Sequence, residues 1–301
     1  MAESPMSASP YEVLGVAASV SDIALRRAFR KALRETHPDT GGDPQRFTAV
    51  QLAWERIGTP EKRAQFDRGR VQATADFAPP RASTDQGSKP KARSYGHPGG
   101  WRREQYLAQL REWVGRGATI DDPYDPALVR DAPREIRHIL ADALAEEATA
   151  RTIAALGIAF TAWHDIATPV AGEKLDHIVL GPNGLFALMS EDFGGPVAAR
   201  KGELVGEAVG SARPMQIFAS RAKSLTRPLG VRFSALVMVL PDAALTEPLI
   251  LLGSVRGAPA VAVTQSHLPA LLRAGLPGSK PIGGNELFDV RTRLQAAVRF
   301  V

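Results

Sequence analysis

The sequence predicts an α+β chain of two domains, in which an all-α helical hairpin precedes a larger α/β domain. Residues 8–70 show helical apolar patterns joined by short turns. Residues 71–100 are rich in Pro, Gly, Ser and Lys, which is typical of a disordered linker. Residues 101–301 begin with helical patterns and continue with short apolar segments that are typical of strands. A length of 301 residues is sufficient for both domains.

The overall composition restricts the class of protein. An apolar fraction of 44% supports a packed core. The absence of cysteine excludes disulfides, a thiolate nucleophile and cysteine-ligated zinc, and it suits a reducing, cytoplasmic environment. The first residues lack the segments of a secretory signal, and the most apolar later stretch, residues 233–253, is interrupted by Pro and acidic residues. We therefore expect no membrane partner. The net charge of +5 fits an anionic partner as well as a generally Arg-rich surface.

Two helices are expected before residue 37. Pro10 and Gly15 bound a single helical turn, and the spacing of Ser19 and Asp22 indicates the start of a longer helix. The longer helix has an apolar stripe at helical spacing, formed by Leu25, Ala28, Phe29, Ala32 and Leu33. Its opposite face is basic and consists of Arg26, Arg27, Arg30, Lys31 and Arg34. Like charges at this spacing repel one another. The face is therefore either a solvated surface or, as the lack of acids among these five favours, a binding surface for an acidic partner.

A short loop separates the basic helix from the next one. Pro38 disfavours the helical conformation at His37, so the helix is expected to end before the sequence His37-Pro38-Asp39. Asp43-Pro44 predicts a new helix start. This next helix carries an apolar stripe that can pack against the first, formed by Phe47, Val50, Trp54 and Ile57. After Gly58, residues 59–67 predict a short polar helix.

This order of four helices resembles the J domain of the DnaJ co-chaperone family over residues 8–70. The motifs that carry the resemblance are Pro10-Tyr11-Glu12-Val13-Leu14-Gly15, Ala28-Phe29-Arg30-Lys31, His37-Pro38-Asp39, Phe47 with Ala53-Trp54, and Thr59-Pro60-Glu61-Lys62-Arg63-Ala64-Gln65-Phe66-Asp67. The resemblance implies that the domain stimulates ATP hydrolysis by a DnaK-type chaperone, with the loop and the basic helix touching the ATPase domain and its linker. By the same resemblance Asp39 would pair with a cation of the chaperone, and His37 would help to fix the loop. Pro38 limits the conformations of the loop and so lowers the cost of ordering it on binding.

The second domain is expected to alternate helices with strands. Helices are predicted over residues 101–113, 133–156, 214–225, 267–273 and 285–300. Strands are predicted over residues 158–163, 175–180, 185–188, 197–200, 203–205, 235–240 and 260–263. Asn183-Gly184 and Lys201-Gly202 are signals for tight turns between strands. This order predicts an α/β sandwich-like module.

The second domain resembles the nuclease-related domain called NERD, a branch of the restriction-endonuclease-like fold, over roughly residues 135–275. The resemblance is carried by Gly172-Glu173-Lys174-Leu175-Asp176-His177-Ile178-Val179-Leu180-Gly181-Pro182-Asn183-Gly184-Leu185-Phe186 and by Glu146-Glu147-Ala148-Thr149-Ala150-Arg151. Nucleases of this fold hold a divalent metal such as Mg²⁺ with acidic residues and place a lysine beside the attacking water. The resemblance assigns two acidic positions to Glu146 and Asp176.

The remaining nuclease positions depart from the family pattern. Where an acid, any residue and a lysine are expected, this chain has Met189-Ser190-Glu191. A thioether thus replaces a hard oxygen ligand, and a carboxylate replaces the cation. Catalysis would require Glu191 or Asp192 to rotate inward and a distant lysine, Lys201 or Lys223, to supply the charge. We therefore expect no catalytic residue, metal or cofactor, with a Mg²⁺-dependent nuclease built on Glu146, Asp176, Glu191 and Lys201 as the alternative.

The sequence thus favours a cytoplasmic J-domain co-chaperone that is not an enzyme. Its C-terminal domain is expected to target the chaperone or to bind a client or nucleic acid. Asp176 and His177 are interpreted as a polar pair near a turn, although His177 could also contact a phosphate. A nucleic-acid-binding adaptor without catalysis is a further alternative, and its affinity should fall with salt. The basic residues that could serve such an adaptor are Arg200, Lys201, Arg213, Arg221 and Lys223.

Overall fold

A computed structural model describes residues 4–72, 77–79, 90–115, 117–277 and 281–301. The chain divides into two compact units. Unit 1 comprises Met1–Ala78 and Asp122–Asp131, and unit 2 comprises Pro79–Asp121 and Ala132–Val301. Much of the predicted linker lies outside the described residues. The linker prediction extends too far at its C-terminal end, because Arg93–Tyr95 form strand β1 by pairing with a strand of unit 2. A three-residue strand with such a distant partner carries no periodic signal.

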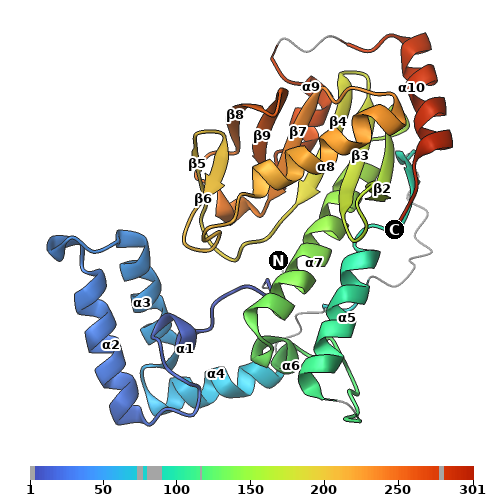
Figure 1. Ribbon diagram of the computed structural model, residues 1–301. Helices are drawn as coiled ribbons and strands as arrows, with labels where there is room; N and C mark the ends of the chain where they lie inside the picture. The colour runs from blue at the N-terminus through green and yellow to red at the C-terminus, as the bar shows by residue number, and fades with distance from the viewer. Residues whose placement is uncertain (1–3, 73–76, 80–89, 116, 278–280) are drawn as a thin grey trace. The chain divides into compact units, whose positions relative to one another are not determined.

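Unit 1 has the helix order that the sequence predicts (Figure 1). Its elements are α1 (Pro10–Val13), α2 (Asp22–Thr36), the 3₁₀ turn η1 (Pro38–Thr40), α3 (Pro44–Ile57), α4 (Pro60–Gln72) and α6 (Pro126–Asp131). Ser21, rather than Ser19, caps α2, since its side chain accepts a hydrogen bond from the Ala24 amide at 3.3 Å. The segment with α6 belongs to unit 1 and lies next to α4. The sequence did not indicate this return of the chain.

The core of unit 1 joins three short helices. Its buried residues are Tyr11, Leu14, Leu25, Val50, Ala53 and Ile57. The rings of Phe29 and Trp54 stack in parallel with centroids 4.2 Å apart, which fixes α2 against α3. Arg63 of α4 donates to the Tyr11 hydroxyl at 3.1 Å and to Asp22 at 2.8 Å. The bundle is therefore held by an apolar core and by one arginine that ties α4 to the first two helices.

Unit 2 is built on a seven-stranded mixed sheet with the order β1-β2-β3-β4-β7-β9-β8. The remaining strands are β2 (Thr161–Ala167), β3 (Lys174–Gly181), β4 (Gly184–Ser190), β7 (Ala235–Leu240), β8 (Leu249–Val255) and β9 (Ala258–Thr264). Strands β2, β3 and β4 are antiparallel neighbours, whereas β4, β7 and β9 run parallel. A separate hairpin consists of β5 (Ala198–Arg200) and β6 (Glu203–Val205), which the Lys201-Gly202 turn joins with both φ angles positive.

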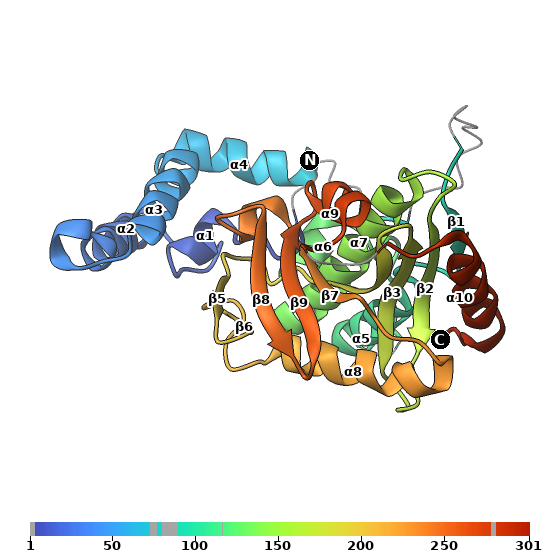
Figure 2. The same ribbon diagram turned by 90° about the horizontal axis from the view of Figure 1, so that it is seen from above.

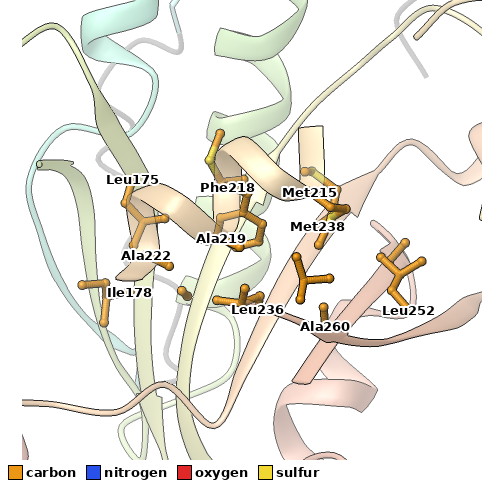
Figure 3. Close-up of a cluster of buried hydrophobic side chains, with 14 of the residues drawn as sticks. Leu175, Ile178, Met215, Phe218, Ala219, Ala222, Leu236, Met238, Leu252 and Ala260 are labelled. Atoms are coloured by element: carbon orange, nitrogen blue, oxygen red, sulfur yellow. The ribbon is translucent and has the colours of Figure 1, made fainter. Parts of the chain in front are cut away.

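Helices cover both faces of this sheet (Figure 2). Helix α8 (Pro214–Leu229) packs on one face, where Phe218 and Ala222 meet Ile178, Leu236 and Met238 (Figure 3). Leu294 of α10 (Gly284–Ala297) joins the same core. Helices α7 (Arg134–Ala154) and α9 (Leu268–Ala274) pack on the opposite face. Helix α5 (Gly100–Val114) lies against α7. Unit 2 is thus a three-layer α/β domain.

Two strand predictions needed correction. The first strand of the expected set begins at Thr161 instead of residue 158, because Ile158 is 60% exposed and precedes the sheet. Strand β8 was not predicted. It is an edge strand that buries few side chains, it follows Pro248, and a register shift occurs between Leu251 and Gly253. Its alternation is therefore too weak to be read from the sequence. No helix in the described part of the chain is long and apolar enough to cross a bilayer.

Candidate functional sites: an exposed loop and a buried ionic cluster

The loop between α2 and α3 is held by its own backbone and by one ring contact. His37 has an extended backbone (φ −64°, ψ 127°), because Pro38 follows it and ends α2. The His37 Nδ1 atom accepts a hydrogen bond from the Asp39 amide at 3.2 Å, and its ring packs edge-on against Phe47 of α3 with centroids 5.0 Å apart. A Cβ at Gly42 would lie 2.2 Å from the carbonyl carbon of Thr36. Only glycine therefore allows the loop to close onto the end of α2.

The arrangement presents Asp39 to solvent. The Asp39 side chain is 88% exposed, and its carboxylate lies 3.8 Å from His37 Nδ1. The His37 side chain is 41% exposed, since one edge of its ring faces Phe47. The loop thus combines a fixed histidine with a free carboxylate that can accept a hydrogen bond from a partner's cation.

The basic face of α2 is defined by Arg26, Arg27, Arg30, Lys31 and Arg34, all of which are exposed. Lys31 forms a loose ion pair with Glu35 at 3.8 Å, one turn further along the helix. Within the described residues, the four arginines of this face form no ion pair. The face therefore keeps most of its positive charge for an external partner.

Unit 2 contains a buried ionic cluster centred on Lys174, the first residue of β3. Its ammonium group donates to Glu146 of α7 at 2.6 Å, to Asp165 of β2 at 2.7 Å and to Asp176 of β3 at 2.9 Å. The side chains of all four residues are at most 3% exposed. The three carboxylates use every proton of the ammonium, so Lys174 is fully satisfied.

The start of α5 closes this cluster. The Gly99 amide donates to Glu146 at 3.2 Å, and the Trp101 amide donates to Asp165 at 3.3 Å. Gly99 has a φ of 75°, and a Cβ there would lie 2.8 Å from the carbonyl oxygen of Ala143. Asp165 also has a positive φ, 54°, which is uncommon for a residue other than glycine. Backbone strain of this kind persists only where the surroundings fix it, as the bonds to Lys174 and Trp101 do here.

The cluster separates the proton affinities of its carboxyls. Burial, together with the neighbouring Asp176, raises the pKa of Glu146 well above its ordinary value. Burial would also raise the pKa of Asp176, but Lys174 and Arg102 outweigh it and lower that pKa. The Lys174 pKa is raised, because its carboxylate partners outweigh the effect of burial. Asp176 and Lys174 are thus a buried ion pair, and Glu146 holds a proton more readily than Asp176 does.

Two buried histidines lie beside the cluster. The Nδ1 atoms of His164 and His177 are 2.7 Å apart, and the Ser94 hydroxyl contacts His164 Nε2 at 2.7 Å. Ser190 lies 3.4 Å from His177 Nε2 and donates to Thr149 of α7 at 2.9 Å. Burial lowers the pKa of His164 to about 4, and it lowers the pKa of His177 well below its ordinary value. Both rings are therefore neutral at neutral pH.

The structure brings together some of the predicted nuclease residues and separates others. Glu146 and Asp176 meet, as the family resemblance requires. Lys201 does not join them, because it is exposed in the β5–β6 turn. Glu191 follows the end of β4 and lies near Arg102 and His138 instead. Lys174 is the lysine that meets Glu146 and Asp176, and the sequence analysis missed it as a site residue. Its spacing of two residues from Asp176 in a strand is the signal that could have found it.

The interpretation of Asp176 and His177 as a polar pair near a turn was wrong. Both residues are fully buried within β3, which runs from Lys174 to Gly181. Each enters a separate network, Asp176 with Lys174 and His177 with His164. A buried, neutral His177 is also unavailable for contact with a phosphate in this conformation.

Comparison with known proteins gives a match in the region of the exposed loop. The sequence model of the family described as the DnaJ domain matches residues 9–67. This region is a J domain. It accounts for α1 to α3 and for most of α4, with the His37-Pro38-Asp39 loop at its centre. The match does not extend into unit 2.

Proteins with a similar J domain match only a small part of this chain. A "DnaJ protein homolog" of Cucumis sativus is 45% identical over 58 residues, which are 19% of this chain and 14% of the relative. "DnaJ protein homolog 2" of Allium porrum is 31% identical over 115 residues, 38% of this chain and 19% of the relative. "Chaperone protein dnaJ A6" of Oryza sativa subsp. japonica is 44% identical over 66 residues, 22% of this chain and 16% of the relative. The chain therefore spans less than a fifth of the length of these relatives.

Proposed function

We propose that the chain is a cytoplasmic J-domain co-chaperone, which binds a DnaK-type ATPase chaperone and stimulates its ATP hydrolysis. The observation that carries the proposal is the loop geometry. His37 is fixed by Phe47 and by the Asp39 amide, while the Asp39 carboxylate is exposed. A rigid loop loses little entropy on binding, and a free carboxylate can pair with a cation of the chaperone.

The basic face of α2 supports the same role. Its exposed arginines would steer the domain toward an acidic surface and raise the rate of association. They occupy the helix that leads directly into the loop, so one partner surface can engage both. His37, Pro38 and Asp39 would form the specific contact, and Arg26, Arg27, Arg30, Lys31 and Arg34 the electrostatic one.

Stimulation of a DnaK-type ATPase by the full-length chain tests this proposal. We expect His37→Gln and Asp39→Asn each to reduce the stimulated rate at least about tenfold, because each removes one partner of a contact at the interface. Glu55→Gln, which changes an exposed acid on α3, is the matched control and should stimulate like the original chain. Equal stimulation by all four proteins would contradict the proposal.

For unit 2 we propose a role in targeting or in binding a client or nucleic acid, on a fold related to NERD. The meeting of Glu146, Asp176 and a lysine supports this relationship. The same contacts oppose catalysis. Lys174 occupies the oxygens that a metal would need, and residues 99–102 cover the carboxylates. A substrate could reach them only after α5 moved away.

The nuclease alternative makes a direct prediction. Incubation of the full-length chain with DNA or RNA and either Mg²⁺ or Mn²⁺ should give no cleavage, because the acid and lysine groups are buried. Cleavage that disappears in Asp176→Ala would establish the nuclease instead. Binding without cleavage, with an affinity that falls as salt rises, would support the nucleic-acid-binding role. Absence of binding would leave targeting or client binding as the role of unit 2.

A further inference from the structure

A second group of polar side chains lies one and two turns before Glu146 on α7. His138 and Asp142 are four residues apart, so both project from the same face of the helix. Glu191, the residue that follows the end of β4, lies beside them. His138 Nε2 lies 3.4 Å from Asp142 Oδ1 and 3.8 Å from Glu191 Oε2. A ligand atom from each of the three residues lies within 4.8 Å of the others.

We propose that His138, Asp142 and Glu191 bind a divalent transition-metal ion such as Zn²⁺. Ligand atoms around a tetrahedral ion with bonds of about 2.1 Å lie about 3.4 Å apart. The distance from His138 to Asp142 equals this value, and the distance from His138 to Glu191, 3.8 Å, is slightly longer. One imidazole nitrogen and two carboxylates form a ligand set suited to zinc, and the fourth position remains open. This site is distinct from the Lys174 cluster, and it departs from the sequence-based expectation that no metal is bound.

Charge balance points to a cation at this place. Together the two groups hold five carboxylates, those of Asp142, Glu146, Asp165, Asp176 and Glu191. Lys174 and Arg102 are the cations that these carboxylates contact. With all five ionised, the formal excess would be three negative charges, which burial disfavours. Burial raises the pKa of Glu146 and of Asp142 well above their ordinary values, so either protons or a bound cation must offset this excess. Arg134 and Asp192 also face His138, but their charges offset one another.

Arg102 lies beside the site, and its contacts with the carboxylates there are long. Its guanidinium lies 3.4 Å from Glu146, 3.6 Å from Asp142 and 3.9 Å from Glu191. In the described structure, Arg102 Nε, Glu146 Oε1 and His138 Nε2 are buried atoms without a hydrogen-bond partner. Glu146 Oε1 and Arg102 Nε face each other at 3.4 Å, whereas His138 Nε2 faces the carboxylate oxygens of Asp142 and Glu191. Unsatisfied donors and acceptors of this kind are rare in buried positions and point to a ligand.

The site has a rigid base and an open side. Asp142 Oδ1 accepts a hydrogen bond from the Asp192 amide at 3.3 Å, which orients this carboxylate toward His138. His138 packs near the ring of Phe193 with centroids 6.0 Å apart. The His138 side chain is 36% exposed, whereas that of Asp142 is 3% exposed. A metal ion can therefore enter past His138 and reach the buried carboxylate.

Calorimetric titration of the chelator-treated, full-length chain with Zn²⁺ tests the proposal. We expect one ion per chain, with binding at least about tenfold weaker in His138→Gln and in Glu191→Gln, since each removes a ligand. Both residues are partly exposed, so these variants should keep the fold, and circular dichroism checks this. Mg²⁺ should bind more weakly than Zn²⁺, because imidazole suits transition metals.

The matched control is His37→Gln, which removes a histidine that lies beside a different carboxylate, that of Asp39. Its affinity for Zn²⁺ should equal that of the original chain. The proposal is overturned if no Zn²⁺ binds, which would mean that protons alone balance the buried charge. It is equally overturned if His37→Gln abolishes binding while His138→Gln and Glu191→Gln leave it unchanged. A Co²⁺-loaded sample should also show the visible absorption of a tetrahedral site, lost in His138→Gln.

Discussion

Lys174 is the residue at the centre of the buried ionic cluster of unit 2. The sequence places Glu191 where a lysine is expected, and the structure supplies a lysine two residues before Asp176. Both side chains belong to β3, and a spacing of two brings them to a common neighbour. In this position Lys174 forms ion pairs with Glu146, Asp165 and Asp176. Its loss would leave buried charges unpaired, which is more unfavourable than the absence of the whole cluster.

His164 predicts a pH dependence at the residue scale. Its pKa is lowered from 6.5 to about 4, so the folded protein keeps the ring neutral while the unfolded chain takes up a proton below pH 6.5. The unfolded state then binds more protons, and the stability of unit 2 falls as the pH drops from 6.5 to 4. The full loss corresponds to about 3 kcal/mol.

Hydrogen exchange of the amides in β2–β4 across this pH range measures that loss. His164→Gln removes the titrating ring and keeps a polar group for Ser94, so its stability should depend less on pH. An unchanged pH dependence in this variant would show that His164 does not cause the effect. The coupling to His177 makes His177→Gln a useful second variant, because its pKa is lowered in the same direction.

At the scale of elements, α2 separates packing from recognition. Its apolar stripe includes Leu25, which is buried, and Phe29, which stacks on Trp54 of α3. Its basic face is exposed and carries one ion pair, Lys31 with Glu35. Substitutions on the basic face should therefore change binding with little effect on stability.

Replacement of Arg27, Arg30 and Arg34 by Gln should slow association with a DnaK-type chaperone by about tenfold or more at low salt. The difference from the original chain should shrink at high salt, because screening already removes the attraction. Stopped-flow measurement of the association rate at several salt concentrations checks both statements. Replacement of Arg200, Lys201 and Arg232, which are exposed in unit 2, gives a control with the same change in net charge. Equal slowing in both triple variants would indicate a general charge effect.

At the scale of the whole molecule, two units with separate cores share one chain. Unit 1 packs around Tyr11 and Ile57, and unit 2 packs on both faces of its sheet. The J domain, residues 9–67, lies within unit 1. The role proposed for unit 2, the selection of a place or a client for a recruited chaperone, would be carried by a part of the chain with its own core.

The local features of this protein could be predicted from sequence, and the long-range ones could not. Some features depend only on residues close together in the sequence, so they can be predicted without knowledge of the fold. They are the end of α2 before Pro38, the Asp43 cap of α3, the Asn183-Gly184 turn and the bounds of β7. The edge strand β8 and the brief strand β1 depend on partners far along the chain. Residue types alone carry little information about such partners.

The sequence by itself determined the J domain, because its helices, caps and loop arise from neighbouring residues. It also identified Glu146 and Asp176 as a candidate pair. Only the tertiary structure decided that Lys174 and Asp165 complete this pair, and that the start of α5 buries all four. The physical reason is that buried charges are arranged by the elements that enclose them. The carboxylates of the two polar groups come from α7, β2, β3 and the end of β4, and only folding brings their charges close to Lys174 and Arg102.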